Sequence, residues 1–191
     1  MNPKQILVVP MSQIIGGMSL GMLFLVLSVQ VLFPAIQIPL FGIIPGTMSM
    51  VDFVVHEAGH LVLSFLGQFI GVMGGTIAQL FGSIMCCILS LKRRRWISLS
   101  IFVFWLGQSL VQISKYVMDA RAQELKLFSP GLVFGGAKPL HDWHYLLETT
   151  GLLWADQIIG RIIFLAGLCA LIGSAGLLFA WGAGWKRTIS I

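Results

Sequence analysis

The sequence predicts an all-α membrane protein, a polytopic bundle of about five transmembrane helices with one membrane-dipping segment and a polar outer loop. Of the 191 residues, 57% are hydrophobic and only 10% are charged, whereas a typical soluble domain carries about 25% charged residues. Between Lys4 and Lys92 the only charged side chains are those of Asp52 and Glu57. This stretch cannot form a water-facing surface. We therefore expect one multi-pass integral membrane domain over residues 1–191.

The elements follow from hydropathy, because a spanning helix needs roughly 20 apolar residues. The expected spans cover about 12–33, 47–66, 76–91, 96–118 and 157–181. The connection FPAIQIPLFGIIPG at Phe33–Gly46 carries three prolines that interrupt a straight helix, yet it is apolar. We expect it to dip into the membrane or to lie on its surface. A glycine-rich break at Gly67–Gly75 precedes the third span, and a polar loop at 119–156 separates the last two spans.

Basic residues gather at 92–95 and at 186–187, as is typical of loops kept on the cytoplasmic side. With both clusters inside, the N-terminus lies outside, the C-terminus lies inside, and the polar loop faces outward. That loop holds five of the seven acidic residues and two of the four histidines. The basic clusters are too short to indicate a nucleic-acid partner, so membrane lipid is the expected surrounding. The three cysteines lack metal-ligand spacing and are interpreted as small core residues.

Polar side chains form stripes within three of the spans. In the second span, an i, i+4 spacing places one set on a single helix face: Asp52, His56, His60 and Ser64. The third and fourth spans carry similar faces: Thr76, Gln79, Ser83 and Cys86, then Gln108, Gln112, Lys115 and Asp119. Such faces are costly toward lipid and are expected to turn inward together. Hydrogen bonding between helices explains Ser, Thr and Gln, but ionisable groups require a charged partner or a metal.

The segment His56-Glu57-Ala58-Gly59-His60 is an H-E-x-x-H motif on an expected helix. Two imidazoles one turn apart can bind one Zn²⁺, and the glutamate between them can act as a general base on metal-activated water. A catalytic zinc site also needs a third protein ligand. The second histidine pair, in His141-Asp142-Trp143-His144, makes His141 the preferred third ligand. The alternative or supporting ligands are Asp52, Asp119, Asp142 and His144.

The segment HEAGHLVLSFLG at His56–Gly67, followed by MGG at Met73–Gly75, resembles the first conserved block of site-2-protease-like membrane zinc metallopeptidases. The resemblance covers about 30 residues and implies zinc ligation by His56 and His60, with Glu57 as catalytic base. In that family the third ligand is the aspartate of an Asp-Gly motif on a later helix, and this chain has no Asp-Gly. The later segments DARAQEL and HDWHYLL look like those of small bacterial membrane proteins with the same HEAGH helix. This resemblance implies a location in a bacterial inner membrane.

The sequence is consistent with two functions. The first is a membrane-embedded zinc metallopeptidase acting on a membrane protein or peptide, with Glu57 taking a proton from metal-activated water. The second is a non-catalytic small subunit of a larger membrane complex, held together by a structural metal or by a proton-carrying His/carboxylate cluster. A closed fourth metal position, with His144 as the candidate side chain, would favour the subunit. A di-iron oxidoreductase would need more His and carboxylate ligands than the chain offers.

Overall fold

The structure, a computed structural model, describes residues 9–36, 38, 40–125 and 141–184. It is all α, as the sequence predicts, and the described residues include five helices that are long and apolar enough to cross a membrane. The chain is therefore a multi-pass integral membrane protein. The long helices are α1 (Met11–Leu32), α2 (Ile43–Leu63), α3 (Gln68–Lys92), α4 (Trp96–Met118) and α7 (Asp156–Gly182). Single turns of 3₁₀ helix cover Ser64–Leu66 and Leu153–Ala155, and a short helix, α6, covers Asp142–Thr149.

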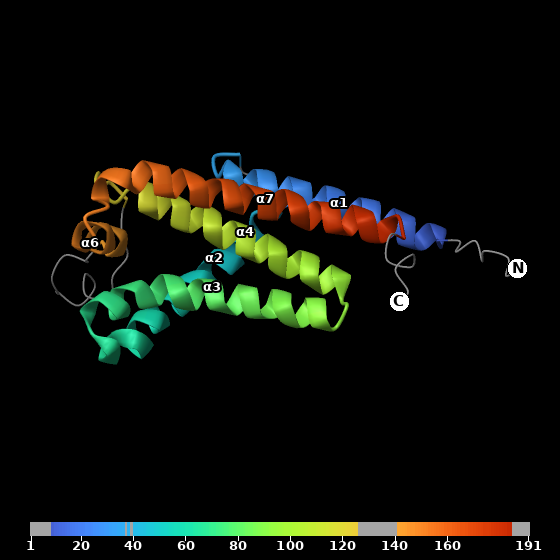
Figure 1. Ribbon diagram of the computed structural model, residues 1–191. Helices are drawn as coiled ribbons and strands as arrows, with labels where there is room; N and C mark the ends of the chain where they lie inside the picture. Colours follow the sequence, from blue (N-terminus) through green and yellow to red (C-terminus); the bar gives the residue numbers. More distant parts are fainter. Residues whose placement is uncertain (1–8, 37, 39, 126–140, 185–191) are drawn as a thin grey trace, which may run out of the picture.

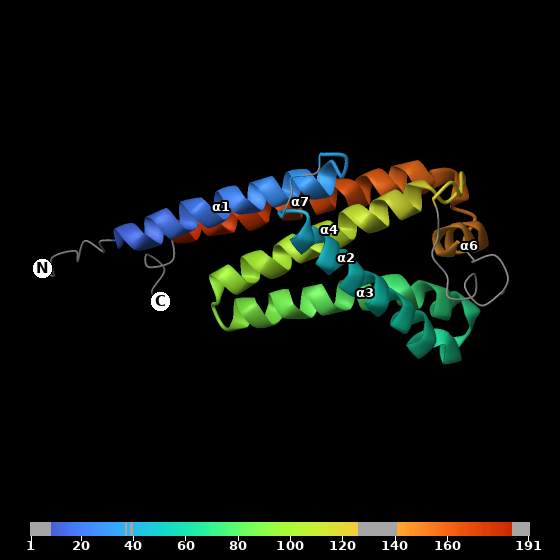
Figure 2. The same cartoon turned by 180° about the vertical axis from the view of Figure 1, so that it is seen from behind.

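Helices α1, α4 and α7 lie side by side and form the core of the bundle (Figures 1 and 2). Small residues let α4 and α7 approach closely. A Cβ on Gly107 would come within 3.0 Å of the backbone of α7, and Gly160 faces Met118 in the same way. The buried apolar side chains between the three helices include Phe24, Phe104 and Leu171. Because lipid offers no hydrophobic drive for helix association, this close packing is what holds spanning helices together.

Helices α2 and α3 form a second, antiparallel pair at one side of the bundle (Figure 1). The prediction of a glycine-rich break at Gly67–Gly75 is wrong for most of this range. Of its glycines, only Gly67, with a φ of +102°, lies outside a helix, and α3 begins at Gln68. The glycines that follow are helical because they face α2, where Gly59 and Gly74 bring the two backbones together. The close packing offsets the poor helix propensity of glycine.

The first helix runs in the opposite sense to the one expected. The Gln13 side-chain amide donates a hydrogen bond to the carbonyl of Trp181 (2.7 Å), so α1 begins beside the end of α7. Both helices therefore have these ends on the side of the bundle where α3 turns into α4 (Figure 1). The expected direction assumed that each apolar helix crosses the membrane completely. In the structure α2 starts beside the middle of α4, where the carbonyl of Pro45 accepts a hydrogen bond from Gln108. Because α1 and α2 therefore do not make two full crossings, the direction of α1 is reversed.

The described parts of the polar segment 119–156 lie at the opposite end of the bundle. Helix α6 sits there, next to the end of α4 and the start of α7 (Figure 2). Leu147 of α6 packs in a small core with Ile113 and Val117 of α4. The Arg121 side chain forms an ion pair with the buried carboxylate of Asp156, 2.7 Å away, which ties the segment to α7. Residues 126–140 of the expected loop fall outside the described part.

Candidate metal centre

The two histidines of the HExxH motif lie one turn apart on the face of α2 that packs against α3. Their ring centroids are 4.7 Å apart, with the rings nearly perpendicular to each other. The outer face of α2 carries exposed apolar side chains, among them Val54, Leu61 and Val62. The i, i+4 spacing therefore places His56 and His60 on the protein side of the helix and leaves lipid-compatible residues outside.

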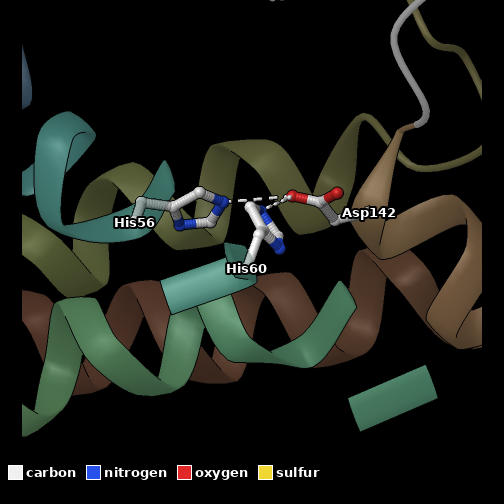
Figure 3. Close-up of side chains that lie close together, drawn as sticks. All are labelled: His56, His60 and Asp142. Carbon is white, nitrogen blue, oxygen red and sulfur yellow. Dashed lines mark hydrogen bonds and ion pairs between the residues drawn. The ribbon is translucent and has the colours of Figure 1, made fainter. Parts of the chain in front are cut away.

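A carboxylate from α6 meets both imidazoles. The Asp142 Oδ2 atom lies 3.1 Å from His56 Nε2 and 3.2 Å from His60 Nε2 (Figure 3). The three side chains each offer one ligand atom, and these atoms all lie within 4.8 Å of one another. Residues 86 positions apart in the chain thus form a group that can hold a metal ion.

The other ring nitrogens determine what the converging atoms can do. His60 Nδ1 lies 2.9 Å from the carbonyl oxygen of Gly71, which can only accept, so Nδ1 carries the hydrogen. In the neutral ring, Nε2 then presents a lone pair toward the Asp142 carboxylate. His56 Nδ1 lies 3.2 Å from Gln79 Oε1, an arrangement with the same consequence. Lone pairs converging on a carboxylate need a cation between them, either a proton or a metal ion, and outer hydrogen bonds of this kind typically orient metal-binding histidines.

Gly75 of α3 lies directly beneath the two rings. A Cβ at this position would come within 2.5 Å of His56 Nε2 and 2.6 Å of His60 Nε2. Any larger residue would therefore displace the nitrogens that converge on Asp142. The close approach of α3 leaves the imidazoles their space, and it depends on glycine at this one position.

Asp142 is the first residue of α6, and a side chain of α4 helps to hold its backbone in position. Its backbone N–H donates to the hydroxyl oxygen of Tyr116 on α4, 3.0 Å away. Burial alone would raise the pKa of the Asp142 carboxyl. The hydrogen bonds that it accepts when a proton lies between it and the imidazoles of His56 and His60 outweigh burial, and the pKa lies below its usual range. The carboxylate is therefore in the ionised form that a cation requires.

The second histidine pair points elsewhere. His141 Nε2 lies 3.2 Å from Asp119 Oδ2, and His141 Nδ1 accepts a hydrogen bond from the backbone N–H of His144 at the start of α6. His144 Nδ1 donates to the carbonyl of Ala120, 2.8 Å away, and its Nε2 lies 3.4 Å from Glu148. The third member of the group is thus Asp142, an alternative in the sequence analysis, while the preferred candidate His141 and the alternative Asp119 pair with each other. Both ring nitrogens of His141 already have partners, because its side chain caps α6 and contacts Asp119.

The remaining acidic candidates on α2 have separate positions. Asp52 is 2% exposed and accepts hydrogen bonds from Trp105 Nε1 and Ser109 Oγ of α4, both at 2.7 Å, so it joins α2 to α4 and does not belong to the metal group. Glu57 is half-buried and interacts electrostatically with His60 and Tyr116. Among the described residues, none forms a hydrogen bond or ion pair with the Glu57 carboxylate, which leaves it free to exchange a proton.

A cavity of about 320 Å³ opens beside the group, lined by His60 and Asp142 together with Gln68 and Val72 at the start of α3. A water molecule or an extended segment can reach the ligand atoms through it. The supporting roles of Gly71, Gly75 and Tyr116 were not predicted from the sequence, and Gln79 was expected only to form hydrogen bonds between helices. The polar stripe of the third span contained the signal for Gln79, whereas nothing in the local sequence indicated Tyr116.

Comparisons with protein-family models, with curated proteins and with solved structures give no match.

Proposed function

We propose that the chain is a membrane-embedded zinc metallopeptidase, in which His56, His60 and Asp142 hold the zinc and Glu57 is the general base. The observation that carries this proposal is the convergence of two imidazole nitrogens and one carboxylate oxygen within 4.8 Å of one another. Two histidines and one carboxylate are a donor set found in catalytic zinc sites, where a fourth position stays open. A zinc ion in such a site acts as a Lewis acid and makes water acidic enough to lose a proton near neutral pH.

The protein groups supply positioning and proton transfer. Gln79 and the Gly71 carbonyl hold the two rings by their Nδ1 atoms, so that both Nε2 atoms face the zinc position. Glu57 takes the proton of the attacking water and passes it to the leaving amine, a role that its lack of a fixed partner among the described residues permits. The 320 Å³ cavity offers a path for an extended peptide segment. The resemblance of the HEAGH block to membrane metallopeptidases supports a peptide as the substrate class.

The competing function, a non-catalytic subunit with a structural metal, calls for a side chain that closes the fourth position. His144 was the candidate for this role. Its two ring nitrogens instead face the Ala120 carbonyl and Glu148. Among the described residues, His144 therefore does not close the fourth position, which supports the peptidase.

Zinc content of the detergent-purified protein, measured by elemental mass spectrometry, tests the metal site. We expect about one zinc per chain, lost in His56→Ala and in Asp142→Ala. His144→Ala is the matched control, because it makes the same change in the second histidine pair, and it should keep the zinc. A wild-type protein without zinc, after purification with zinc supplied, contradicts the proposal.

Glu57→Gln separates catalysis from metal binding. We expect this variant to bind zinc normally and to cleave membrane-peptide substrates at least about 100-fold more slowly than the wild type, because general-base catalysis contributes on that order. Cleavage assays on a panel of fluorogenic peptides derived from membrane spans would measure the difference. Zinc binding without any wild-type cleavage across the panel would favour the structural-metal subunit.

A further inference from the structure

A second, larger cavity lies between the end of α1, the start of α2 and the second half of α4. Its volume is about 670 Å³, within the range of sites that bind small molecules. It is distinct from the metal centre, since none of the three side chains of the metal group lines it. Its polar lining comes from Gln30, Ser49, Gln108, Gln112 and Lys115.

Hydrogen bonds fix the direction in which the two glutamines of α4 point. The Ser49 hydroxyl donates to the carbonyl of Pro45 (2.8 Å), so the hydroxyl oxygen can only accept further bonds. It accepts from Gln112 Nε2 at 2.6 Å and from Gln108 Nε2 at 3.0 Å. Gln108 Nε2 also donates to the Pro45 carbonyl. Both amide nitrogens therefore donate to α2, and neither amide oxygen has a hydrogen-bond partner among the described residues.

Of these acceptors, the side-chain oxygen of Gln108 most needs a hydrogen-bond donor, because it is buried. Gln108 is 1% exposed, and its Oε1 has no hydrogen-bond partner among the described residues. Buried polar atoms in folded proteins are nearly always paired, so an unpaired one in a residue that lines a cavity can accept a hydrogen bond from a bound molecule.

Lys115 brings a positive charge to the same cavity. It lies on α4, inside a candidate membrane span, and is half-buried. All seven acidic side chains of the protein lie in the described part of the chain, and none forms an ion pair with Lys115. Cationic side chains within membrane spans normally face a partner or a polar cavity. This one faces a cavity that lacks an anion of its own.

We infer that this cavity binds the headgroup of a phospholipid, with the phosphate on Lys115 and a hydroxyl or ammonium donor of the headgroup on Gln108 Oε1. The apolar part of the lining, which includes Val31, Ile43 and Val111, suits the glycerol and acyl portion of a lipid. A soluble phosphate ester offers the same polar chemistry without an apolar part. The apolar lining and the membrane setting favour the lipid.

Two substitutions test the site without touching the metal centre. Lys115→Gln removes the charge. Gly46→Leu fills the cavity, because Gly46 lines it and a Cβ there would meet open space. Gly46 lies within α2, so replacing glycine favours the helix and the fold should be kept. The matched controls are Arg161→Gln, an exposed charge on α7, and Gly82→Leu, a glycine of α3 whose Cβ would also meet open space.

The readout is native mass spectrometry of protein purified from membranes and re-exposed to micelles that contain phosphatidylglycerol or phosphatidylethanolamine. We expect one retained phospholipid per wild-type chain, with occupancy at least about tenfold lower in Lys115→Gln and in Gly46→Leu and unchanged in the two controls. The helical circular-dichroism signal, measured on the same samples, reports whether each variant is folded.

Three results would overturn the inference. The first is equal lipid retention in all five proteins, which would place the lipid on the outer surface. The second is a wild-type chain that retains no phospholipid. The third is displacement of the lipid by equimolar glycerol 3-phosphate or phosphoethanolamine, which would identify a soluble phosphate ester as the ligand. None of these results bears on the metal centre, so the inference and the proposed function fail independently.

Discussion

Each of the two histidine pairs in this chain encloses an acidic residue, Glu57 in the first and Asp142 in the second, yet the pairs behave differently. His56 and His60 turn toward the same oxygen atom, whereas His141 and His144 point to different partners. The first pair lies wholly inside a regular helix. His141 precedes α6 with an extended backbone (φ −83°, ψ 103°). Spacing along the chain predicts a shared face only where the backbone is helical throughout.

The acidic residues differ in the same way. In the first pair, the two histidines belong to the metal group, and Glu57 has no hydrogen-bond or ion-pair partner among the described residues. In the second pair, Asp142 belongs to the metal group, and the two histidines bind α6 and the chain before it. A metal centre assembled from both pairs therefore uses one helix for its two nitrogens and the first residue of another helix for its oxygen. The following substitutions test this difference between the two pairs.

The largest effect is expected at Gly75, which the first pair needs and the second does not. In Gly75→Val the added Cβ would collide with the Nε2 atoms of both His56 and His60. Zinc affinity should fall by about 100-fold or more, since ligand orientation alone accounts for effects of that order. Competition titration with a fluorescent zinc chelator measures it. Gly82→Val makes the same change of helix propensity in open space, and it should bind like the wild type. Equal affinities in the two variants would contradict the geometry.

A smaller effect is expected from the outer hydrogen bond of the first pair. Gln79→Leu removes the acceptor of His56 Nδ1, and zinc affinity should fall by about 10- to 100-fold. The counterpart in the second pair is Asp119→Asn, which changes the partner of His141 and should leave the affinity within about twofold. The same chelator titration compares them. If Asp119→Asn has the larger effect, the metal lies at the second pair.

Tyr116 lies between the two pairs, with its hydroxyl oxygen bound to the Asp142 backbone and its ring centroid 4.3 Å from that of His141. Tyr116→Phe loses one hydrogen bond that positions the carboxylate ligand. Zinc affinity should fall by roughly fivefold, the equivalent of about 1 kcal/mol. Tyr145→Phe on α6 is the control, because its hydroxyl has no partner among the described residues, and isothermal titration of the two variants should separate them. A wild-type affinity in Tyr116→Phe would mean that other contacts position Asp142.

The smallest effect is expected at His141, and it concerns stability. His141→Ala removes the side chain that caps α6, at a cost of about 1 kcal/mol, while His141→Asn keeps a good capping residue. Hydrogen exchange of the α6 amides should therefore be faster only in His141→Ala. Zinc content should be unchanged in both. A loss of zinc in His141→Asn would restore His141 as the third ligand.

Local physical chemistry made much of this molecule readable from the sequence. Long apolar runs predicted all five spanning helices, because each must satisfy its own backbone hydrogen bonds in lipid. The helical period placed His56 and His60 on one face, and burial in a membrane span marked them as candidate site residues. Three of the five spans begin and end within about one residue of their expected bounds.

Contacts between distant elements decided the rest. The choice of Asp142 over His141 depends on how α6 docks against α4, and the direction of α1 depends on its packing along α7. The helical course of α3 through its glycines depends on α2, which lies against it. The cavity around Lys115 exists only where three helices diverge. Hydropathy and period act within one helix, whereas these features arise from the approach of segments many residues apart, and only the tertiary structure determines which of them meet.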